Sequence, residues 1–132
     1  MGTDDDAEVP YPAHREADVV LADGRPVHVR PIRPEDADEL VRFHDSLSER
    51  TVYLRFFAPY PHLTERDISR FTHVDHADRV ALVATVGDRI IGVGRYETVS
   101  PGTAELAFTV HDEHQGRGLG SVLLEHLAAT AR

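Results

Sequence analysis

Three β-strand candidates separated by two-residue turns constrain the fold of this 132-residue chain more than any other feature. The segments 79–86, 89–99 and 103–110 are rich in apolar and β-branched residues, and Gly87-Asp88 and Pro101-Gly102 separate them. Turns this short join neighbouring antiparallel strands, because a parallel connection needs a crossover of about a dozen residues or more. The sequence therefore predicts an antiparallel meander at the centre of the fold.

The segment before the meander predicts a β-hairpin followed by three helices. Asp23-Gly24 separates two short β runs within residues 19–32, which is a strong hairpin signal. Pro34 is typical of a first helical turn, and Ser48 and Thr64 are suitable N-cap residues for the second and third helices. The chain therefore places its helices between the hairpin and the meander.

The remaining segments complete the prediction. Residues 118–131 predict a last helix with only a narrow polar edge, so we expect that helix to be buried. Gly92 and Gly94 within a strand predict a bulge or a close approach of another backbone. The polar, acidic segment 1–18 is interpreted as a flexible lead-in, and residues 19–132 as one domain.

The composition excludes several classes of function. The formal net charge is −9, which is unfavourable for a protein that binds nucleic acid and favours a cationic partner. The chain has no cysteine, which excludes disulfides, thiolate metal sites and a cysteine nucleophile. The N-terminus has no apolar run suited to a signal peptide or a membrane span, so we expect a cytoplasmic protein without membrane contact.

The segment 111–114, His-Asp-Glu-His, contains four side chains of types that bind metals. A zinc-binding helix spaces its histidines four residues apart, whereas His111 and His114 are three apart at the end of a strand. Neighbouring side chains of an extended segment point to opposite sides, so the four groups cannot converge on one ion. We expect no metal here, and we interpret Asp112 and Glu113 as solvated loop charges.

The segment 115–121, Gln-Gly-Arg-Gly-Leu-Gly-Ser, is typical of a loop that binds phosphate. It follows a strand and begins a helix, where free main-chain N–H groups and the helix dipole attract anions. A ligand can approach the main chain at the three glycines, and Arg117 and Ser121 can donate further hydrogen bonds. The absence of lysine excludes a P-loop, and a dinucleotide-binding fingerprint needs a parallel βαβ unit.

This motif and the elements before it resemble the GNAT N-acetyltransferase superfamily, whose motif [RQ]-x-x-G-x-[GA] matches residues 115–120. The resemblance implies an α/β (α+β) fold with helices flanking a mixed, mostly antiparallel sheet, of which residues 19–132 are the N-terminal and central part. It implies that acetyl-CoA is the co-substrate and that its pantetheine arm pairs with the main chain of Thr109 and Val110. Its pyrophosphate would be held by Gln115, Gly116, Arg117, Gly118, Leu119, Gly120 and Ser121.

Glu105 is the candidate general base. Alternation places it on the strand face opposite Leu106 and Phe108, where small neighbours could leave a cleft. Partial burial there would make the carboxylate a better base, but alternation alone equally allows an exposed glutamate on an edge strand. The string Ala-Glu-Leu-Ala-Phe before the motif resembles the segment of protein-lysine acetyltransferases that carries their catalytic glutamate. The resemblance therefore implies that Glu105 accepts the proton of the attacking amine.

Residues 27–57, 74–84 and 114–128 resemble the acetyltransferase domain of bacterial, and especially actinobacterial, Pat-type protein lysine acetyltransferases. The acceptor this implies is a lysine on a protein such as an acyl-CoA synthetase. A small-amine acetyltransferase and a non-catalytic acyl-CoA-sensing module are the alternatives. The superfamily continues past the motif helix, so we expect the general acid beyond residue 132, or a homodimer whose second copy supplies missing contacts.

Overall fold

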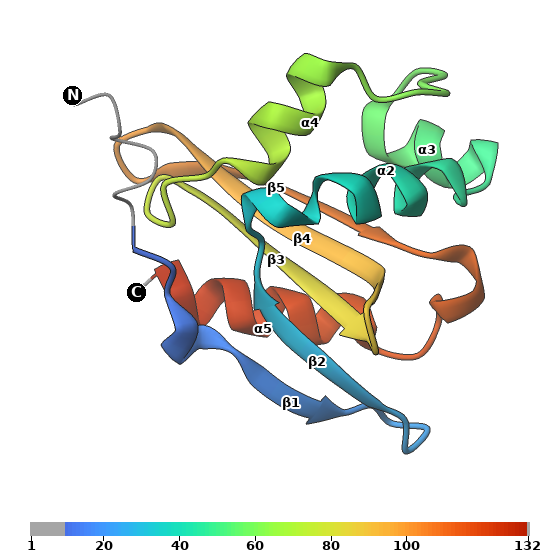
Figure 1. Cartoon of the computed structure of the whole chain (residues 1–132). Coiled ribbons are helices and arrows are strands. Elements are labelled where there is room, and N and C mark those ends of the chain that lie inside the picture. Colours follow the sequence, from blue (N-terminus) through green and yellow to red (C-terminus); the bar gives the residue numbers. More distant parts are fainter. Residues whose placement is uncertain (1–9, 132) are drawn as a thin grey trace.

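Five strands form one sheet in the order β1-β2-β3-β4-β5 in the computed structural model, which describes residues 10–131 (Figure 1). Every neighbouring pair is antiparallel, which confirms the predicted hairpin and meander. The strands are β1 (Ala17–Val20), β2 (Pro26–Pro31), β3 (Arg79–Val86), β4 (Arg89–Ser100) and β5 (Thr103–Val110). Because the turns between β3, β4 and β5 are short, these three strands lie side by side in chain order.

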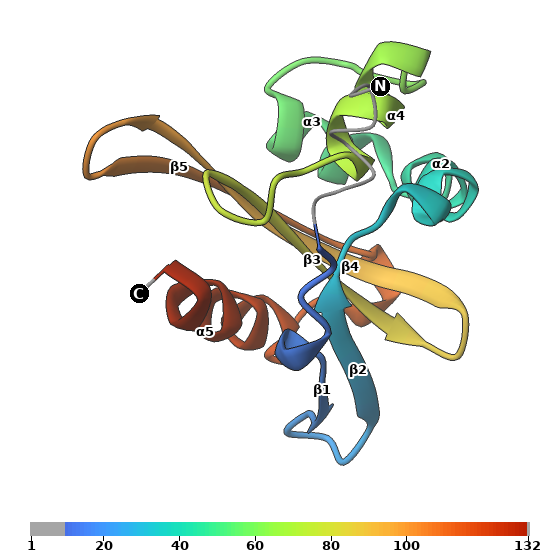
Figure 2. The ribbon, with the colours of Figure 1, turned by 60° about the vertical axis from the view of Figure 1, so that its left-hand side comes forward.

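Helices cover both faces of this sheet (Figure 2). One face carries α2 (Ala37–Asp45), α3 (Glu49–Phe56) and α4 (Glu65–Thr72), and the other carries α5 (Leu119–Ala131). Three single-turn 3-10 helices join these elements: η2 (Ala13–Arg15), η3 (Pro34–Asp36) and η4 (Asp112–His114). The predicted caps are confirmed, since the Ser48 hydroxyl accepts the Thr51 N–H and the Thr64 hydroxyl accepts the Asp67 N–H.

Two apolar clusters fill the layers between the helices and the sheet. One packs α5 on the sheet and includes Leu82 and Leu123, and the other packs α2 on it and includes Ile32 and Phe43. β3 contributes alternate side chains to both clusters, so it is buried on both faces. Burial on two faces explains why residues 79–86 form a continuous apolar run without polar alternation.

The register of β3 and β4 shifts between Ala84 and Thr85, opposite Gly92, which fits the predicted bulge. Side chains of other elements pack closely on Gly92 and Gly94. A Cβ atom on Gly92 would lie 3.0 Å from the Leu119 side chain, and one on Gly94 would lie 3.2 Å from the Leu123 Cβ. α5 therefore lies against the main chain of β4. This contact places the loop before α5 at the end of β5, where the glycine-rich motif lies.

The prediction that α5 is buried around nearly all of its surface is wrong. Leu119, Leu123 and Leu127 are buried, whereas Leu124 is 45% exposed, because the helix packs on the sheet through a single stripe.

Within residues 10–131, no helix has the length and apolar character that crossing a membrane requires.

Residues 10–18 pack on the sheet and do not form a flexible lead-in. The Tyr11 hydroxyl donates to the Pro31 carbonyl at 3.1 Å, and the His28 ring lies 2.8 Å from Asp18 and 2.9 Å from Glu16. Hydrogen bonds with Asp18 and Glu16 raise the pKa of His28. The folded domain thus includes residues before the predicted boundary at residue 19, and residues 1–9 lie outside the described part.

Candidate active site

The loop between β5 and α5 holds the glycine-rich motif in an open conformation. Gly116 and Gly118 have φ angles of +78° and +84°, which glycine adopts without strain. Cβ atoms placed on Gly116, Gly118 or Gly120 would meet no heavy atom within 4 Å. The space beside the loop is therefore available to a ligand that approaches the main chain.

The main-chain N–H groups from 116 to 121 are free donors in this loop. Among residues 10–131, none of them has a hydrogen-bond acceptor within the protein, and the first bond from α5 back to the loop runs from the Val122 N–H to the Gly118 carbonyl at 3.1 Å. A row of free donors at the N-terminus of a 13-residue helix suits an anion. These residues fit the pyrophosphate of acetyl-CoA.

The side chain of Gln115 is used inside the protein. Its amide nitrogen donates to the Val110 carbonyl at 2.9 Å and to the Thr51 hydroxyl at 3.1 Å. Its main-chain N–H donates to the Asp112 carbonyl at 3.4 Å. Gln115 therefore connects the motif to β5 and α3, and it shapes the loop that surrounds the anion site.

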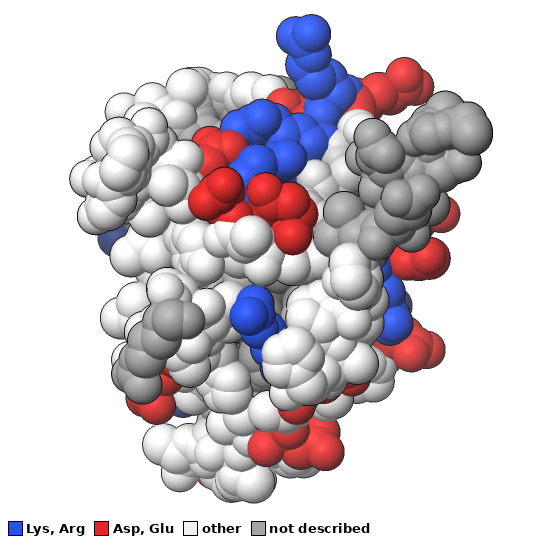
Figure 3. Space-filling model, turned by 90° about the vertical axis from the view of Figure 1, so that its left-hand side faces the viewer, with Lys and Arg blue, Asp and Glu red and all other residues white. Residues whose placement is uncertain are grey.

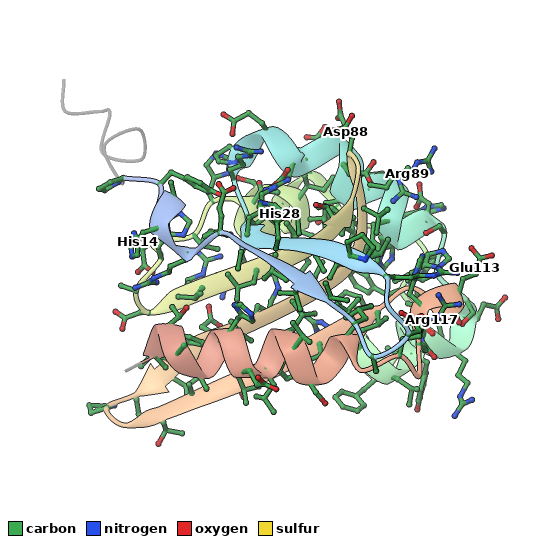
Figure 4. All side chains as sticks on the ribbon, turned by 90° about the horizontal axis from the view of Figure 1, so that it is seen from below. His14, His28, Asp88, Arg89, Glu113 and Arg117 are labelled. Carbon is green, nitrogen blue, oxygen red and sulfur yellow. The ribbon has the colours of Figure 1, made fainter. Side chains whose placement is uncertain are left out.

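Asp112 is more than a solvated loop charge, which corrects the interpretation from the sequence. Its carboxylate accepts the Ser48 N–H at 3.0 Å, the Ser48 hydroxyl at 2.6 Å and the Thr51 hydroxyl at 2.9 Å. Desolvation acts to raise the pKa of Asp112, but the bonds from Ser48 and Thr51 outweigh it and lower that pKa. Glu113 has an 82% exposed side chain that points to solvent (Figure 4).

Arg117 reaches the turn of the β1–β2 hairpin (Figure 4). Its Nη1 lies 3.5 Å from a carboxylate oxygen of Asp23, without hydrogen-bond geometry, and the Arg25 Nε lies 3.8 Å from the same oxygen. Two guanidiniums thus share one carboxylate beside the loop. Burial, followed by repulsion from His111, Arg117 and Arg25, lowers the pKa of His114, which agrees with a positive local potential.

The main chain of Val110 faces the open edge of the described sheet. The His111 N–H donates to the Ile91 carbonyl at 2.9 Å, and the same register pairs Thr109 with Val93. Since bonded and non-bonded pairs alternate in an antiparallel ladder, the main chain of Thr109 is paired with β4, whereas the Val110 N–H points to the edge. Of the two residues predicted to pair with a pantetheine arm, Val110 is the one whose N–H is free to do so.

Glu105 is exposed on β5, so the partial burial expected from the sequence is not observed. It lies opposite Glu97 of β4, whose carboxylate forms ion pairs with Arg70 and with Arg79, the latter at 3.3 Å. Within the described residues, Glu105 itself forms no ion pair. It lies on the sheet face that also carries Arg95, because Glu97 and Arg95 are two residues apart on β4.

In the described part of the chain, no three metal-binding side chains come close enough together to hold an ion. The segment 111–114 forms a turn of 3-10 helix in which the His111 Nδ1 accepts the Glu113 N–H at 3.1 Å.

One arginine near the site was missed by the sequence analysis. Arg95 of β4 and Arg55 of α3 line a cavity together with Thr109 of β5. A single arginine in a strand belongs to no motif. The available signal was its position, because alternation places Arg95 on the same face as Val93, which is buried.

The family model "Acetyltransferase (GNAT) family" matches residues 41–132. The chain belongs to this family. Acetyltransferase PA5475 of Pseudomonas aeruginosa is 34% identical over 117 residues, which are 85% of this chain and 63% of that protein. Acetyltransferase Pat of Mycolicibacterium smegmatis is 32% identical over 117 residues, 86% of this chain and 35% of that protein. This chain therefore spans less than two thirds of each of these two relatives.

A solved structure agrees with the fold and with the Pat-type resemblance. The crystal structure of the GNAT domain of S. lividans PAT superposes with a TM-score of 0.89 at 52% identity, covering 93% of this chain and 75% of that one. The predicted GNAT-like fold of helices around a mostly antiparallel sheet is thereby confirmed.

Proposed function

We propose that this chain acts in an N-acetyltransferase that uses acetyl-CoA and modifies lysine side chains of proteins. The observation that carries the proposal is the row of free N–H groups at 116–121, beside glycines that leave open space. Acetyl-CoA supplies an acetyl group activated as a thioester. Membership of the GNAT family and similarity to Pat-type proteins support this assignment.

Each part of the site has a role in this reaction. The loop 116–121 binds the pyrophosphate, and the Val110 N–H at the edge of β5 donates to the extended arm or to the thioester carbonyl. Binding both substrates in one complex lets the amine attack the thioester carbon directly, so that a C–N bond forms, the C–S bond breaks and CoA leaves as its thiolate. Glu105 accepts the proton of the attacking amine, through a water molecule; the support is its position on β5 before the motif and the absence of an ion pair to its carboxylate within the described residues.

The acceptor we propose is a lysine on a protein such as an acyl-CoA synthetase, in the cytoplasm. The support is the 52% identity to the S. lividans PAT domain and the net charge of −9, which attracts cationic groups. We also propose a homodimer, in which the second copy contributes contacts at the edge of β5.

The test is transfer of labelled acetyl groups from acetyl-CoA to a cell lysate, followed by location of the labelled lysine. Glu105→Gln should lower kcat by about 10²–10⁴-fold, the usual contribution of a general base, while the Kd for acetyl-CoA stays unchanged. Glu113→Gln is the matched control, because that carboxylate is 82% exposed and forms no contact with the loop donors.

Three results would contradict parts of the proposal. Unchanged kcat in Glu105→Gln would remove the assigned base. Label on a small amine and on no protein would indicate a small-amine acetyltransferase. Binding of acetyl-CoA without transfer to either kind of acceptor would indicate an acyl-CoA-sensing module.

A further inference from the structure

A small cavity lies between the three helices of one sheet face and strands β4 and β5. Its volume is about 40 Å³, which is room for a few water-sized groups. Apolar side chains of α2 form one wall. The residues that matter for the argument are two arginines, two aromatic rings and one β5 side chain: Arg55, Phe56, Phe71, Arg95 and Thr109.

Both guanidiniums stack on aromatic rings. The Arg95 Cζ lies 4.5 Å from the ring centroid of Phe71, and the Arg55 Cζ lies 5.9 Å from that centroid and 4.6 Å from the centroid of Phe56. Such stacking contributes about 0.5–2 kcal/mol. Removal of a charged group from water costs several kcal/mol. Stacking alone therefore offsets only part of the cost of placing two cations here.

These two cations have no carboxylate partner in the described residues. Neither forms an ion pair, and no aspartate or glutamate lines the cavity. Elsewhere in the described residues, carboxylates neutralise several part-buried arginines, among them Arg42 and Arg79. Arg30, for example, donates to both carboxylate oxygens of Asp36, at 2.7 and 2.8 Å. Within residues 10–131, the two guanidiniums of the cavity have no such carboxylate, and that of Arg95 donates only to the Phe71 carbonyl, 3.5 Å from its Nη1.

The pKa shifts of the two arginines agree with the absence of a carboxylate partner in the cavity. Burial, with added repulsion from Arg55, lowers the pKa of Arg95 to about 9, and burial also lowers the pKa of Arg55. An anion between the two would reverse both effects, because an opposite charge stabilises the protonated form.

We propose that this cavity is a subsite for a carboxylate carried by a substrate. Guanidiniums bind carboxylates through short, charge-assisted hydrogen bonds. Thr109 lines the cavity and adjoins Val110, so the far end of an acyl group held at that edge can reach the arginines. Glu105 lies on the same sheet face, so a carboxylate near the reacting amine of the acceptor is the other source. The identity of the substrate rests on the proposed function, but the anion site does not.

The first experiment needs no catalysis. Sodium propionate and neutral propionamide are titrated into isotopically labelled protein, and the Nε–H signals of Arg55 and Arg95 are followed by NMR. We expect propionate to shift both signals and propionamide to shift neither, with the exposed Arg66 of α4 as the internal control. Unchanged signals, or an equal shift of Arg66, would overturn the inference even if the protein transfers acetyl groups.

The second experiment distinguishes the two sources. One arm compares the Kd of succinyl-CoA with that of butyryl-CoA, which has the same chain length without the carboxylate. The other arm compares the KM of lysine peptides that carry aspartate or asparagine beside the lysine. We expect about a tenfold preference for the carboxylate form in one arm, the usual size for a hydrogen bond to a charged group.

Three variants show whether the two arginines cause that preference. It should disappear in Arg95→Gln and in Arg55→Gln and persist in Arg66→Gln. Thermal unfolding of each variant is measured in parallel, and we expect the first two to fold at least as stably as the natural chain, because an unpaired cation is removed. Equal affinities in both arms, or a preference that survives both cavity substitutions, would overturn the inference.

Discussion

At the scale of single residues, Asp112 determines how the motif loop meets the helical side of the sheet. Its carboxylate binds the N-terminus of α3 through Ser48 and Thr51, and Thr51 in turn accepts a hydrogen bond from Gln115. Residues separated by more than sixty positions thus share one hydrogen-bond network. The network holds the start of the anion-binding loop against α3.

Asp112→Ala should lower the free energy of unfolding by about 1–2 kcal/mol, because the hydrogen bonds from Ser48 and Thr51 to its carboxylate are lost. Because the folded state lowers the pKa of Asp112, its contribution is present above the pKa of the unfolded chain, about 3.9, and disappears as the pH falls through the folded value. Urea unfolding at pH 7 and at low pH measures both effects. The control is Glu113→Ala, and an equal loss of stability there would contradict this role.

At the scale of elements, the contact between α5 and β4 positions the motif. Two glycines in β4 let α5 lie against the strand, and the helix therefore begins where β5 ends. The N-terminus of this helix lies at the proposed anion site, and its leucine stripe packs in the core. The stability of the fold therefore depends on the two glycines of β4, whereas anion binding depends on the glycines of the motif loop.

Gly94→Ala should destabilise the fold by about 1–3 kcal/mol, because the added methyl group would lie 3.1 Å from Phe108 and 3.2 Å from Leu123. Gly120→Ala meets no atom within 4 Å, so we expect its stability to be unchanged. Its methyl group would instead enter the ligand space and raise the Kd for acetyl-CoA by about tenfold, or about 1.4 kcal/mol. Chemical unfolding and isothermal titration calorimetry separate the two effects, and a reversed pattern would contradict the assignment.

At the scale of the whole molecule, the charge is acidic overall but mixed locally. The net charge is −9, yet Figure 3 shows arginine and acidic side chains side by side on one face. Arg70, Arg79 and Glu97 form one such group near Glu105. The long-range field therefore favours cationic groups in general, while neighbouring side chains determine the local charge.

The KM for a lysine peptide with flanking arginines should rise several-fold between about 0.05 and 0.5 M salt, because salt screens exposed charges beyond about 10 Å. A peptide with neutral flanking residues should show a much smaller change. Steady-state acetyl transfer to both peptides provides the measurement. Equal salt dependence would show that the net charge of the protein does not steer its acceptor.

The sequence by itself determined the features that depend on neighbouring residues. Turns at Gly87-Asp88 and Pro101-Gly102 specify the meander, caps at Ser48 and Thr64 specify where helices begin, and the glycine spacing after β5 specifies the anion loop. These signals are local, because backbone geometry and short-range hydrogen bonds produce them.

Only the tertiary structure decided which side chains meet across the layers. The bond from Asp112 to Ser48, the exposure of Glu105 and the placement of Arg55 and Arg95 around Phe71 all depend on how helices pack on the sheet. Periodicity assigns a residue to a face, but burial and pairing depend on elements distant in the sequence. For that reason the anion loop was predicted from the sequence, whereas the arginine cavity was found only in the fold.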